Sequence, residues 1–138
     1  MPSAEAFAAA GGRGTGLLAR PILVVEDEEL VRDIIARELE DAGYLVIEAA
    51  SAEAGLEVIE TRPVGLLFTD IRLPGQMDGW RLAEEARSRC PDLPVVYATG
   101  YSAAEPRLVA GGVFLRKPYL PSTVVATIER LIGTDGGE

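Results

Sequence analysis

Several polar side chains that can do chemistry stand at the ends of apolar runs in this sequence. They are Glu26 and Asp27 after "PILVV", Asp70 at the end of "VGLLFTD", Thr99 in "PVVYATG", and Lys117 in "GVFLRKP". If these runs are neighbouring strands, three carboxylates, a hydroxyl and an ammonium group meet at one place. Two like charges about 4 Å apart repel by roughly 4 kcal/mol at an effective dielectric constant near 20, so the three carboxylates together require a cation.

The ligand types indicate which cation this is. Oxygen ligands without histidine or cysteine favour a hard divalent ion, and a site that leaves positions for water and phosphate oxygens favours Mg²⁺. A phosphoryl group placed there would be held by the metal, the Lys117 ammonium and the Thr99 hydroxyl, which is how phosphoryl transfer is generally stabilised. The carboxylate on the central strand, Asp70, would then be the nucleophile and form an aspartyl phosphate.

Each of these residues also has a simpler interpretation when it is taken alone. Asp70 could cap a turn, Thr99 could be an ordinary strand-end hydroxyl, and Lys117 could be a solvated charge before Pro118. The chemical interpretation is favoured because all of them fall at strand ends of one chain.

The composition excludes several other classes of protein. The 138 residues make about one domain, and 48% hydrophobic with 25% charged residues is typical of a globular chain with a core. The net charge of −9 disfavours direct binding to nucleic acid. The sequence contains no histidine, which excludes Ser-His-Asp catalysis and an internal phosphohistidine. A phosphohistidine donor would therefore belong to another protein.

Cysteine use and hydropathy indicate the compartment. Cys90 is the sole cysteine, so no internal disulfide can form, and its place before Pro91 fits a passive small residue. The sequence has no charged-then-apolar leader and no run of about 18 apolar residues. We therefore expect a cytoplasmic protein that does not interact with membranes.

From residue 21 the sequence alternates between strand-like and helix-like patterns. Apolar runs predict strands over 21–25, 44–49, 64–70, 94–100 and 112–118, and helical spacing predicts helices over 28–42, 51–62, 78–90, 103–110 and 122–132. Gly43 is expected to end the first helix, and Ser51 and Asp78 to cap the second and third. Ser102-x-x-Glu105 fits a capping box for the fourth.

Five such units with short connections predict an α/β fold. We expect a five-stranded parallel sheet in the order 2-1-3-4-5 with five helices on both faces, the flavodoxin-like doubly wound arrangement. In this order the polar strand ends converge at the carboxyl edge of the sheet, where such sheets bind ligands. The domain is predicted over residues 21–133, with a flexible N-terminal tail over 1–20 and a short flexible tail over 134–138.

Residues 21–132 resemble the receiver domain of two-component response regulators. The resemblance rests on the pair Glu26-Asp27, on "TDIRLPG" followed by "MDG", on "YATG", on the aromatic Phe114 and on "KP" at 117. It implies that Asp70 accepts phosphate from a histidine kinase or a histidine phosphotransfer protein. It further implies that Asp27, Asp70 and the backbone carbonyl of Arg72 ligate Mg²⁺, with Glu26 helping directly or through water.

The resemblance also implies a switch and an output surface. Thr99 would move to hydrogen-bond the phosphoryl group, Phe114 would change rotamer, and Lys117 would pair with the phosphate. The changed surface would comprise the fourth strand, residues 103–110, the fifth strand and the helix over 122–132. Phe114 has no hydroxyl, so its switching would depend on packing, and Tyr101 is a second aromatic that could share this role.

Two other classes of function fit the sequence less well. An aspartyl-phosphate hydrolase would place a second acid two residues after the nucleophile, and Arg72 occupies that position, so turnover of an external substrate is not expected. A nucleotide-binding module would need a glycine-rich loop after the first strand. Only "GTDGGE" follows the last helix. This favours a stand-alone receiver that docks on an unknown downstream protein over a piece of a hybrid kinase.

Overall fold

The computed structural model describes residues 20–100 and 107–133. Five strands form one parallel sheet in the order β2-β1-β3-β4-β5, as predicted. Their bounds are β1 Ile22–Val25, β2 Val46–Ala49, β3 Leu66–Asp70, β4 Val95–Thr99 and β5 Val113–Arg116. All residues of β1, β3 and β4 are buried, which explains why these strands begin as continuous apolar runs instead of alternating patterns.

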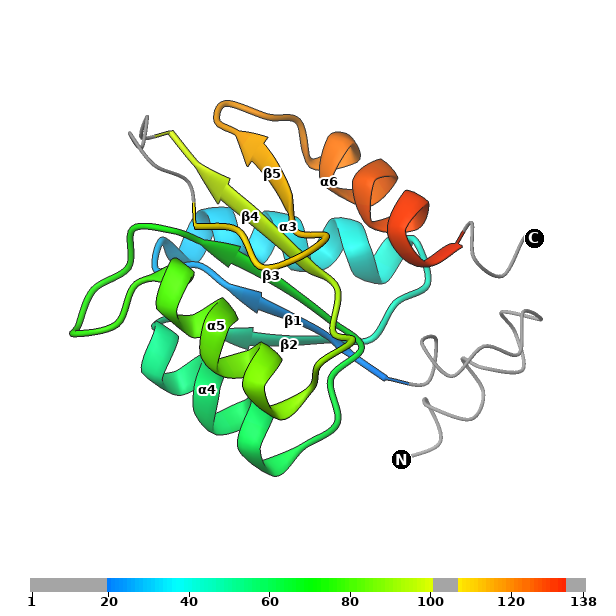
Figure 1. The fold of residues 1–138 in the computed structure, drawn as a ribbon. Coiled ribbons are helices and arrows are strands. Elements are labelled where there is room, and N and C mark those ends of the chain that lie inside the picture. The colour runs from blue at the N-terminus through cyan, green and yellow to red at the C-terminus, as the bar shows by residue number, and fades with distance from the viewer. Residues whose placement is uncertain (1–19, 101–106, 134–138) are drawn as a thin grey trace.

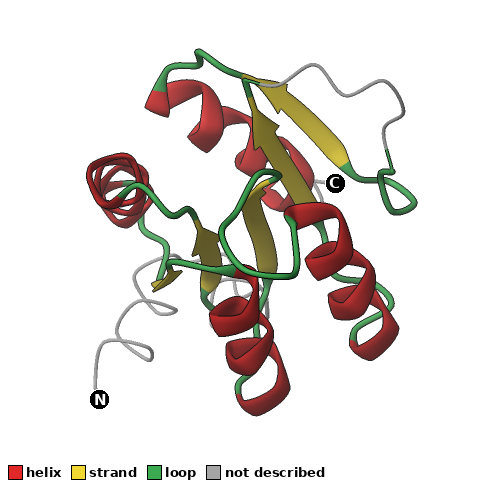
Figure 2. Ribbon diagram, turned by 90° about the vertical axis from the view of Figure 1, so that its left-hand side faces the viewer, coloured by secondary structure: helices red, strands yellow, loops and turns green. Residues whose placement is uncertain are grey.

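Helices cover both faces of the sheet (Figure 1). They are α3 Glu29–Asp41, α4 Ala52–Thr61, α5 Gly79–Arg89 and α6 Pro121–Ile128, the last continued by a π-helical turn, η1 Glu129–Gly133. In both views α3 and α6 lie on one face and α4 and α5 on the other (Figure 2). Side chains alternate along β1 between the two cores, so Ile22 and Val24 pack under α3 and α6 while Leu23 and Val25 pack under α4 and α5.

The predicted caps at Ser51 and Asp78 and the predicted helix end at Gly43 are confirmed. The Ser51 hydroxyl accepts a hydrogen bond from the Ala54 N–H at 3.1 Å, and an Asp78 carboxylate oxygen accepts one from the Arg81 N–H at 2.9 Å. Gly43 ends α3 in the left-handed region, with a φ of 104°, which glycine adopts at little cost.

The prediction of a helix over 103–110 is wrong for the part that the structure describes. Residues 107–110 are not helical, so the described residues contain four α-helices instead of five. The Val109 N–H donates to the Tyr97 hydroxyl at 2.9 Å, and Gly111 with a φ of 75° leads into β5. Pro106, which has no N–H to donate, disfavours the same helix.

Several other expectations fall on residues outside the described part of the chain. The capping box at Ser102 and Glu105 is among them, and so are Tyr101 and all of the two predicted tails except Arg20. The domain limits of 21–133 therefore stay a prediction. Within the described ranges, no helix has the length and apolar character needed to cross a bilayer.

Gly79, the first residue of α5, lies directly against the backbone at the end of β3. Its N–H donates to the Ile71 carbonyl at 2.8 Å. A Cβ atom at Gly79 would overlap the Asp70 carbonyl oxygen and would stand 2.8 Å from the Ile71 Cα. Because these neighbours are backbone atoms, a side chain here forces the loop between β3 and α5 to move.

We expect Gly79→Ala to lower the free energy of unfolding by about 1–3 kcal/mol, the usual range for forcing an extra carbon into a packed site. Urea unfolding at neutral pH measures this change. Gly100→Ala is the matched control, because a Cβ there would make only an ordinary contact of 3.5 Å with the Lys117 side chain. Equal stability of the two variants would contradict the steric argument.

Candidate functional site

The predicted site residues come together at the carboxyl edge of the sheet. Glu26 follows β1, Asp70 ends β3, Thr99 ends β4, and Lys117 follows β5. Glu26, Asp70 and Thr99 are buried, whereas Asp27 is exposed. One carboxylate oxygen from each of Glu26, Asp27 and Asp70 lies within 4.8 Å of the other two. The three acids therefore form one cluster that is open to solvent on the side of Asp27.

Lys117 is the only lysine in the sequence, and its ammonium lies among these acids. Its Nζ is 3.1 Å from Asp70 Oδ2 and 3.4 Å from Glu26 Oε1. The Lys117 backbone N–H donates to the Thr99 carbonyl at 2.9 Å, which extends the pairing of β4 and β5 to the site. The pKa of Lys117 is raised: burial, the largest influence, lowers it, but the hydrogen bond to Asp70 and the charges of Asp70 and Glu26 together outweigh this effect.

Backbone donors fix the two buried carboxylates. Glu26 Oε2 accepts from the Glu28 N–H at 3.0 Å, and Asp70 Oδ1 accepts from the Ile71 N–H at 2.9 Å. Burial raises the pKa of Glu26, and the charge of Asp70 adds to this rise against the opposing hydrogen bond from Glu28. In each acid, one carboxylate oxygen thus accepts a hydrogen bond from a backbone N–H and the other lies within hydrogen-bonding distance of the Lys117 ammonium.

Arg32 is a residue of the site that the sequence analysis did not identify. It extends from α3, and its guanidinium donates to the Glu26 carbonyl at 2.8 Å and to Glu48 Oε1 at 3.2 Å. Arg32 therefore ties the end of β1 to β2. Arg32, Glu48 and Glu26 come from three separate elements, so no local spacing in the sequence predicts these contacts. The one available signal was that Glu48 is a polar residue within the second predicted strand.

The remaining predicted residues, Arg72 and Phe114, lie outside the acidic cluster of Glu26, Asp27 and Asp70. Arg72 is exposed in the loop that follows Asp70. Phe114 is half-buried in the core under α4 and α5. Its ring is nearly parallel to that of Trp80, with 6.4 Å between the ring centroids and an interplanar angle of 8°. The Trp80 ring also packs against the Tyr97 ring, with 4.9 Å between the ring centroids. Phe114 thus packs against an aromatic neighbour and the apolar core.

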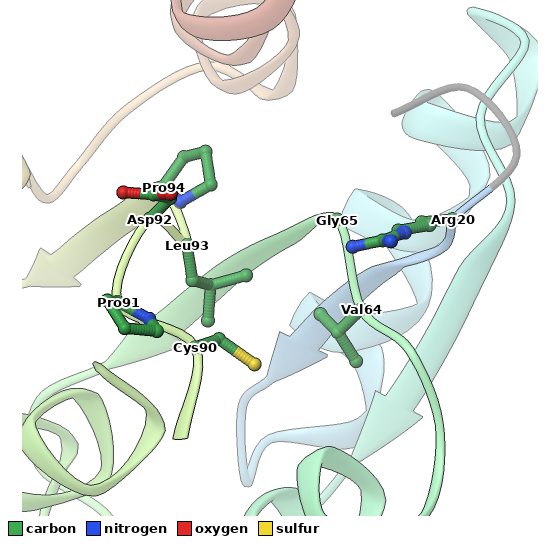
Figure 3. A pocket seen from close by; sticks show the side chains of 8 residues that line it. All are labelled: Arg20, Val64, Gly65, Cys90, Pro91, Asp92, Leu93 and Pro94. Atoms are coloured by element: carbon green, nitrogen blue, oxygen red, sulfur yellow. The ribbon is translucent and has the colours of Figure 1, made fainter. Parts of the chain in front are cut away.

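A separate recess of ≈ 330 Å³ opens at the other end of the strands (Figure 3). It is lined by Arg20, Val64, Gly65 and the segment Cys90–Pro94, all of which precede or approach the starts of β1, β3 and β4. Cys90 lines this recess as a free, partly buried thiol. Because the recess lies at the amino ends of the strands, it is remote from the acidic cluster.

The raised pKa of Glu26 predicts how stability depends on pH in metal-free protein. The folded state holds this proton to a higher pH than the unfolded state, whose value is near 4.5, so the Glu26 contribution is present below pH 4.5 and is lost as the pH rises through the folded pKa. In EDTA, thermal melts should therefore show Glu26→Gln gaining stability over the native chain as the pH rises from 4.5 toward 8. Parallel profiles for the two proteins would contradict this account.

A five-stranded parallel sheet in this order, with an acid cluster and one lysine at its carboxyl edge, defines a class of signalling domain. Residues 22–129 match the family model described as the response regulator receiver domain. The chain therefore belongs to the response regulator receiver family, and it is a receiver domain of two-component signalling.

Two curated relatives illustrate how this domain is used. The chain is 32% identical over 115 residues to the response regulator receiver protein CpdR of Brucella abortus, covering 80% of this chain and 95% of that protein. It is 34% identical over 122 residues to the nitrogen assimilation regulatory protein NtrX of Azorhizobium caulinodans, covering 85% of this chain but 27% of that protein. The chain thus spans about a quarter of the length of NtrX and nearly all of CpdR.

Solved structures show the same fold. The CheY-like receiver domain protein of Methanospirillum hungatei superposes with a TM-score of 0.78 at 33% identity, covering 83% of this chain and 94% of that one. The response regulator TrrA of Thermotoga maritima, solved in complex with Mg(2+)-BeF, has a TM-score of 0.74 at 26% identity and covers 82% and 99% of the two chains.

Proposed function

We propose that this receiver domain accepts a phosphoryl group on Asp70 from a phosphohistidine of a histidine kinase or histidine phosphotransfer protein. The observation that carries the proposal is the position of Asp70. Its carboxylate ends the central strand, one oxygen is hydrogen-bonded to Lys117 at 3.1 Å, and it belongs to the acid cluster with Glu26 and Asp27. The sequence contains no histidine, so the phosphohistidine donor lies outside these 138 residues.

The oxygen donors of the cluster fit Mg²⁺, because they are carboxylates without nitrogen or sulfur ligands. Asp27, Asp70 and the backbone carbonyl of Arg72 would hold the ion, with Glu26 beside it. When bound, Mg²⁺ would neutralise the carboxylates and the charge of the phosphoryl oxygens. The Mg(2+)-BeF complex of the related TrrA supports this choice of metal.

The reaction assigned to the chain's own residues is an in-line displacement. An Asp70 carboxylate oxygen attacks phosphorus, the O–P bond of an acyl phosphate forms, and the N–P bond of the donor imidazole breaks. The Lys117 ammonium, already paired with Asp70, binds a phosphoryl oxygen. The Thr99 hydroxyl, buried at the end of the neighbouring strand, binds another.

An apolar surface beside the site suits the donor. Leu30, Ile34 and Leu120 are large apolar side chains that remain exposed. They lie on α3 and at the start of α6, which share one face of the sheet (Figure 1). Residues next to them in the sequence, Val31 and Tyr119, help to line a recess of ≈ 450 Å³ whose other lining residues are Glu28, Gly100, Lys117 and Pro118. Because Lys117 is part of its wall, a partner helix on this surface can bring its phosphohistidine to Asp70.

We expect Leu30→Glu to slow phosphotransfer from the protein donor by about tenfold or more, because Leu30 is the most exposed of these apolar residues at 78%. The measurement uses a panel of the organism's autophosphorylated histidine kinases and compares the fastest donor on the native and variant chains. Acetyl phosphate is the control, since a small donor does not need the surface. A loss of equal size with both donors would contradict a docking role.

The proposed output is docking on a downstream protein rather than turnover of a substrate. Phosphorylation would move Thr99 and repack Phe114, and Tyr101 would share this switch. The responding surface would comprise β4, residues 103–110, β5 and α6. An aspartyl-phosphate hydrolase is the alternative, but Arg72 stands where such an enzyme needs a general acid. A cytoplasmic location, where ATP-fed kinases supply phosphohistidine, is part of the proposal.

Intact-mass measurement after incubation with acetyl phosphate tests the proposed function. With Mg²⁺ we expect the native chain to gain one phosphoryl group, and with excess EDTA we expect no gain. The same sample should not turn over p-nitrophenyl phosphate steadily, which separates a receiver from a hydrolase. Failure to gain a phosphoryl group from acetyl phosphate and from every kinase of the panel would refute the proposal.

A further inference from the structure

The loop over residues 71–78 carries the backbone between Asp70 and α5. Hydrogen bonds fix both ends of this loop, one where it leaves β3 and one where it enters α5. The Gly79 N–H donates to the Ile71 carbonyl at 2.8 Å, and the Asp78 side chain caps α5. The Arg72 carbonyl that is proposed as a metal ligand lies in this loop, so the position of the loop helps to set the geometry of the site.

The tip of the loop is held by a carboxylate from a different element. Glu53 stands in the first turn of α4, and its Oε2 accepts hydrogen bonds from the backbone N–H groups of Gln76 at 3.0 Å and Met77 at 3.1 Å. Gly75, with a φ of 96°, turns the chain toward this carboxylate. A Cβ at Gly75 would stand 2.8 Å from Glu53 Oε1, so the tip lies close against the acid.

The charged form of Glu53 makes these contacts although its side chain is exposed. The pKa of Glu53 is lowered, first by its own backbone N–H and then by those of Gln76 and Met77. The helix that carries it is fixed in place by its Ser51 cap and by packing on α5. A rigid element therefore presents an ionised acceptor to the loop.

We propose that Glu53 is a positioning residue for the phosphoacceptor site: by holding the tip of the loop over 71–78, it sets the position of the Arg72 carbonyl and thereby the affinity for Mg²⁺. This inference rests on the proposed function. Glu53 does not belong to the acid cluster of Glu26, Asp27 and Asp70, and it acts only through the backbone of the loop. Residues that orient metal ligands typically change metal affinity by about 10–100-fold when they are replaced.

The test compares three variants of the full chain by calorimetric titration with Mg²⁺ alone. Glu53→Ala, which removes the acceptor, should weaken Mg²⁺ binding by about tenfold. Glu53→Gln keeps an amide oxygen at the same reach and should stay within about threefold of the native chain. Glu57→Ala removes an equal charge from an exposed position one turn along α4 and should bind Mg²⁺ as the native chain does.

Two further readouts separate positioning from a general loss of stability. Amide hydrogen exchange at Gln76 and Met77 should be faster in Glu53→Ala than in Glu57→Ala, even without metal. The rate of phosphorylation by acetyl phosphate should recover in Glu53→Ala when Mg²⁺ is raised to saturation, because affinity and not chemistry is impaired.

The outcomes distinguish this inference from the proposed function. A native chain that does not bind Mg²⁺ and takes up no phosphoryl group from acetyl phosphate or from any kinase of the panel would refute both. A native chain that does both, with Glu53→Ala equal to Glu57→Ala in affinity and exchange, would overturn the role of Glu53 alone. Equal weakening by Glu53→Gln, Glu53→Ala and Glu57→Ala would also overturn it, because the effect would then come from net charge instead of the hydrogen bonds.

Discussion

Asp70→Asn is expected to abolish phosphorylation by acetyl phosphate, with a fall in rate of roughly a thousandfold or more. The amide oxygen of asparagine is a poor nucleophile and cannot form a stable acyl phosphate. Asparagine has nearly the same shape, and its oxygen can still accept the hydrogen bond from the Ile71 N–H that Asp70 Oδ1 accepts at 2.9 Å. The loss should therefore be chemical, with the fold retained, and intact mass reports it directly.

The matched control for this variant is Asp92→Asn. Asp92 is an exposed aspartate between α5 and β4, at the amino ends of the strands. The Asp92→Asn variant should gain a phosphoryl group on Asp70 at the native rate. If Asp70→Asn still acquired a hydroxylamine-sensitive phosphoryl group, the acceptor would be another acid, and peptide mapping would then examine Glu26 and Asp27.

The sheet and the acid cluster could be predicted because their signals are local in the sequence. A strand buried on both faces must be a continuous apolar run, and β1, β3 and β4 begin as such runs. Their order then follows from the doubly wound pattern, and parallel strands place their carboxyl ends at one edge. The strand order and direction are therefore enough to predict that Glu26, Asp70 and Thr99 lie close together.

The features that the sequence did not reveal depend on contacts between separate elements. The hydrogen bond from Val109 to the Tyr97 hydroxyl places the segment before β5, and no local spacing encodes it. The helical pattern over 103–110 is short, and the missing N–H of Pro106 weakens it further, so this contact outweighs it for the described residues 107–110. Arg32 in α3 likewise contacts Glu48 in β2, a separate element. The structure was therefore needed to show that Arg32 links the end of β1 to β2.

Lys117→Met is expected to change stability, metal affinity and reactivity together. In the metal-free protein the Lys117 ammonium neutralises Asp70 and Glu26 at 3.1 and 3.4 Å. Its loss leaves two buried carboxylates without a counter-charge and should lower the metal-free free energy of unfolding by about 1–3 kcal/mol, below the 3–5 kcal/mol typical of fully buried pairs because Lys117 is partly exposed. Urea unfolding in EDTA measures this loss.

Mg²⁺ should reverse that loss, because the ion takes the place of the missing charge among the same oxygens. We therefore expect Mg²⁺ to bind Lys117→Met more tightly than the native chain and to raise its melting temperature by more. Phosphorylation should nevertheless be about a hundredfold slower at saturating Mg²⁺, since one of the groups proposed to bind the phosphoryl oxygens is gone. Lys117→Arg, which keeps a cation, should retain most of the metal-free stability. Weaker binding of Mg²⁺ by Lys117→Met would show that the ammonium and the metal do not compete for Asp70 and Glu26.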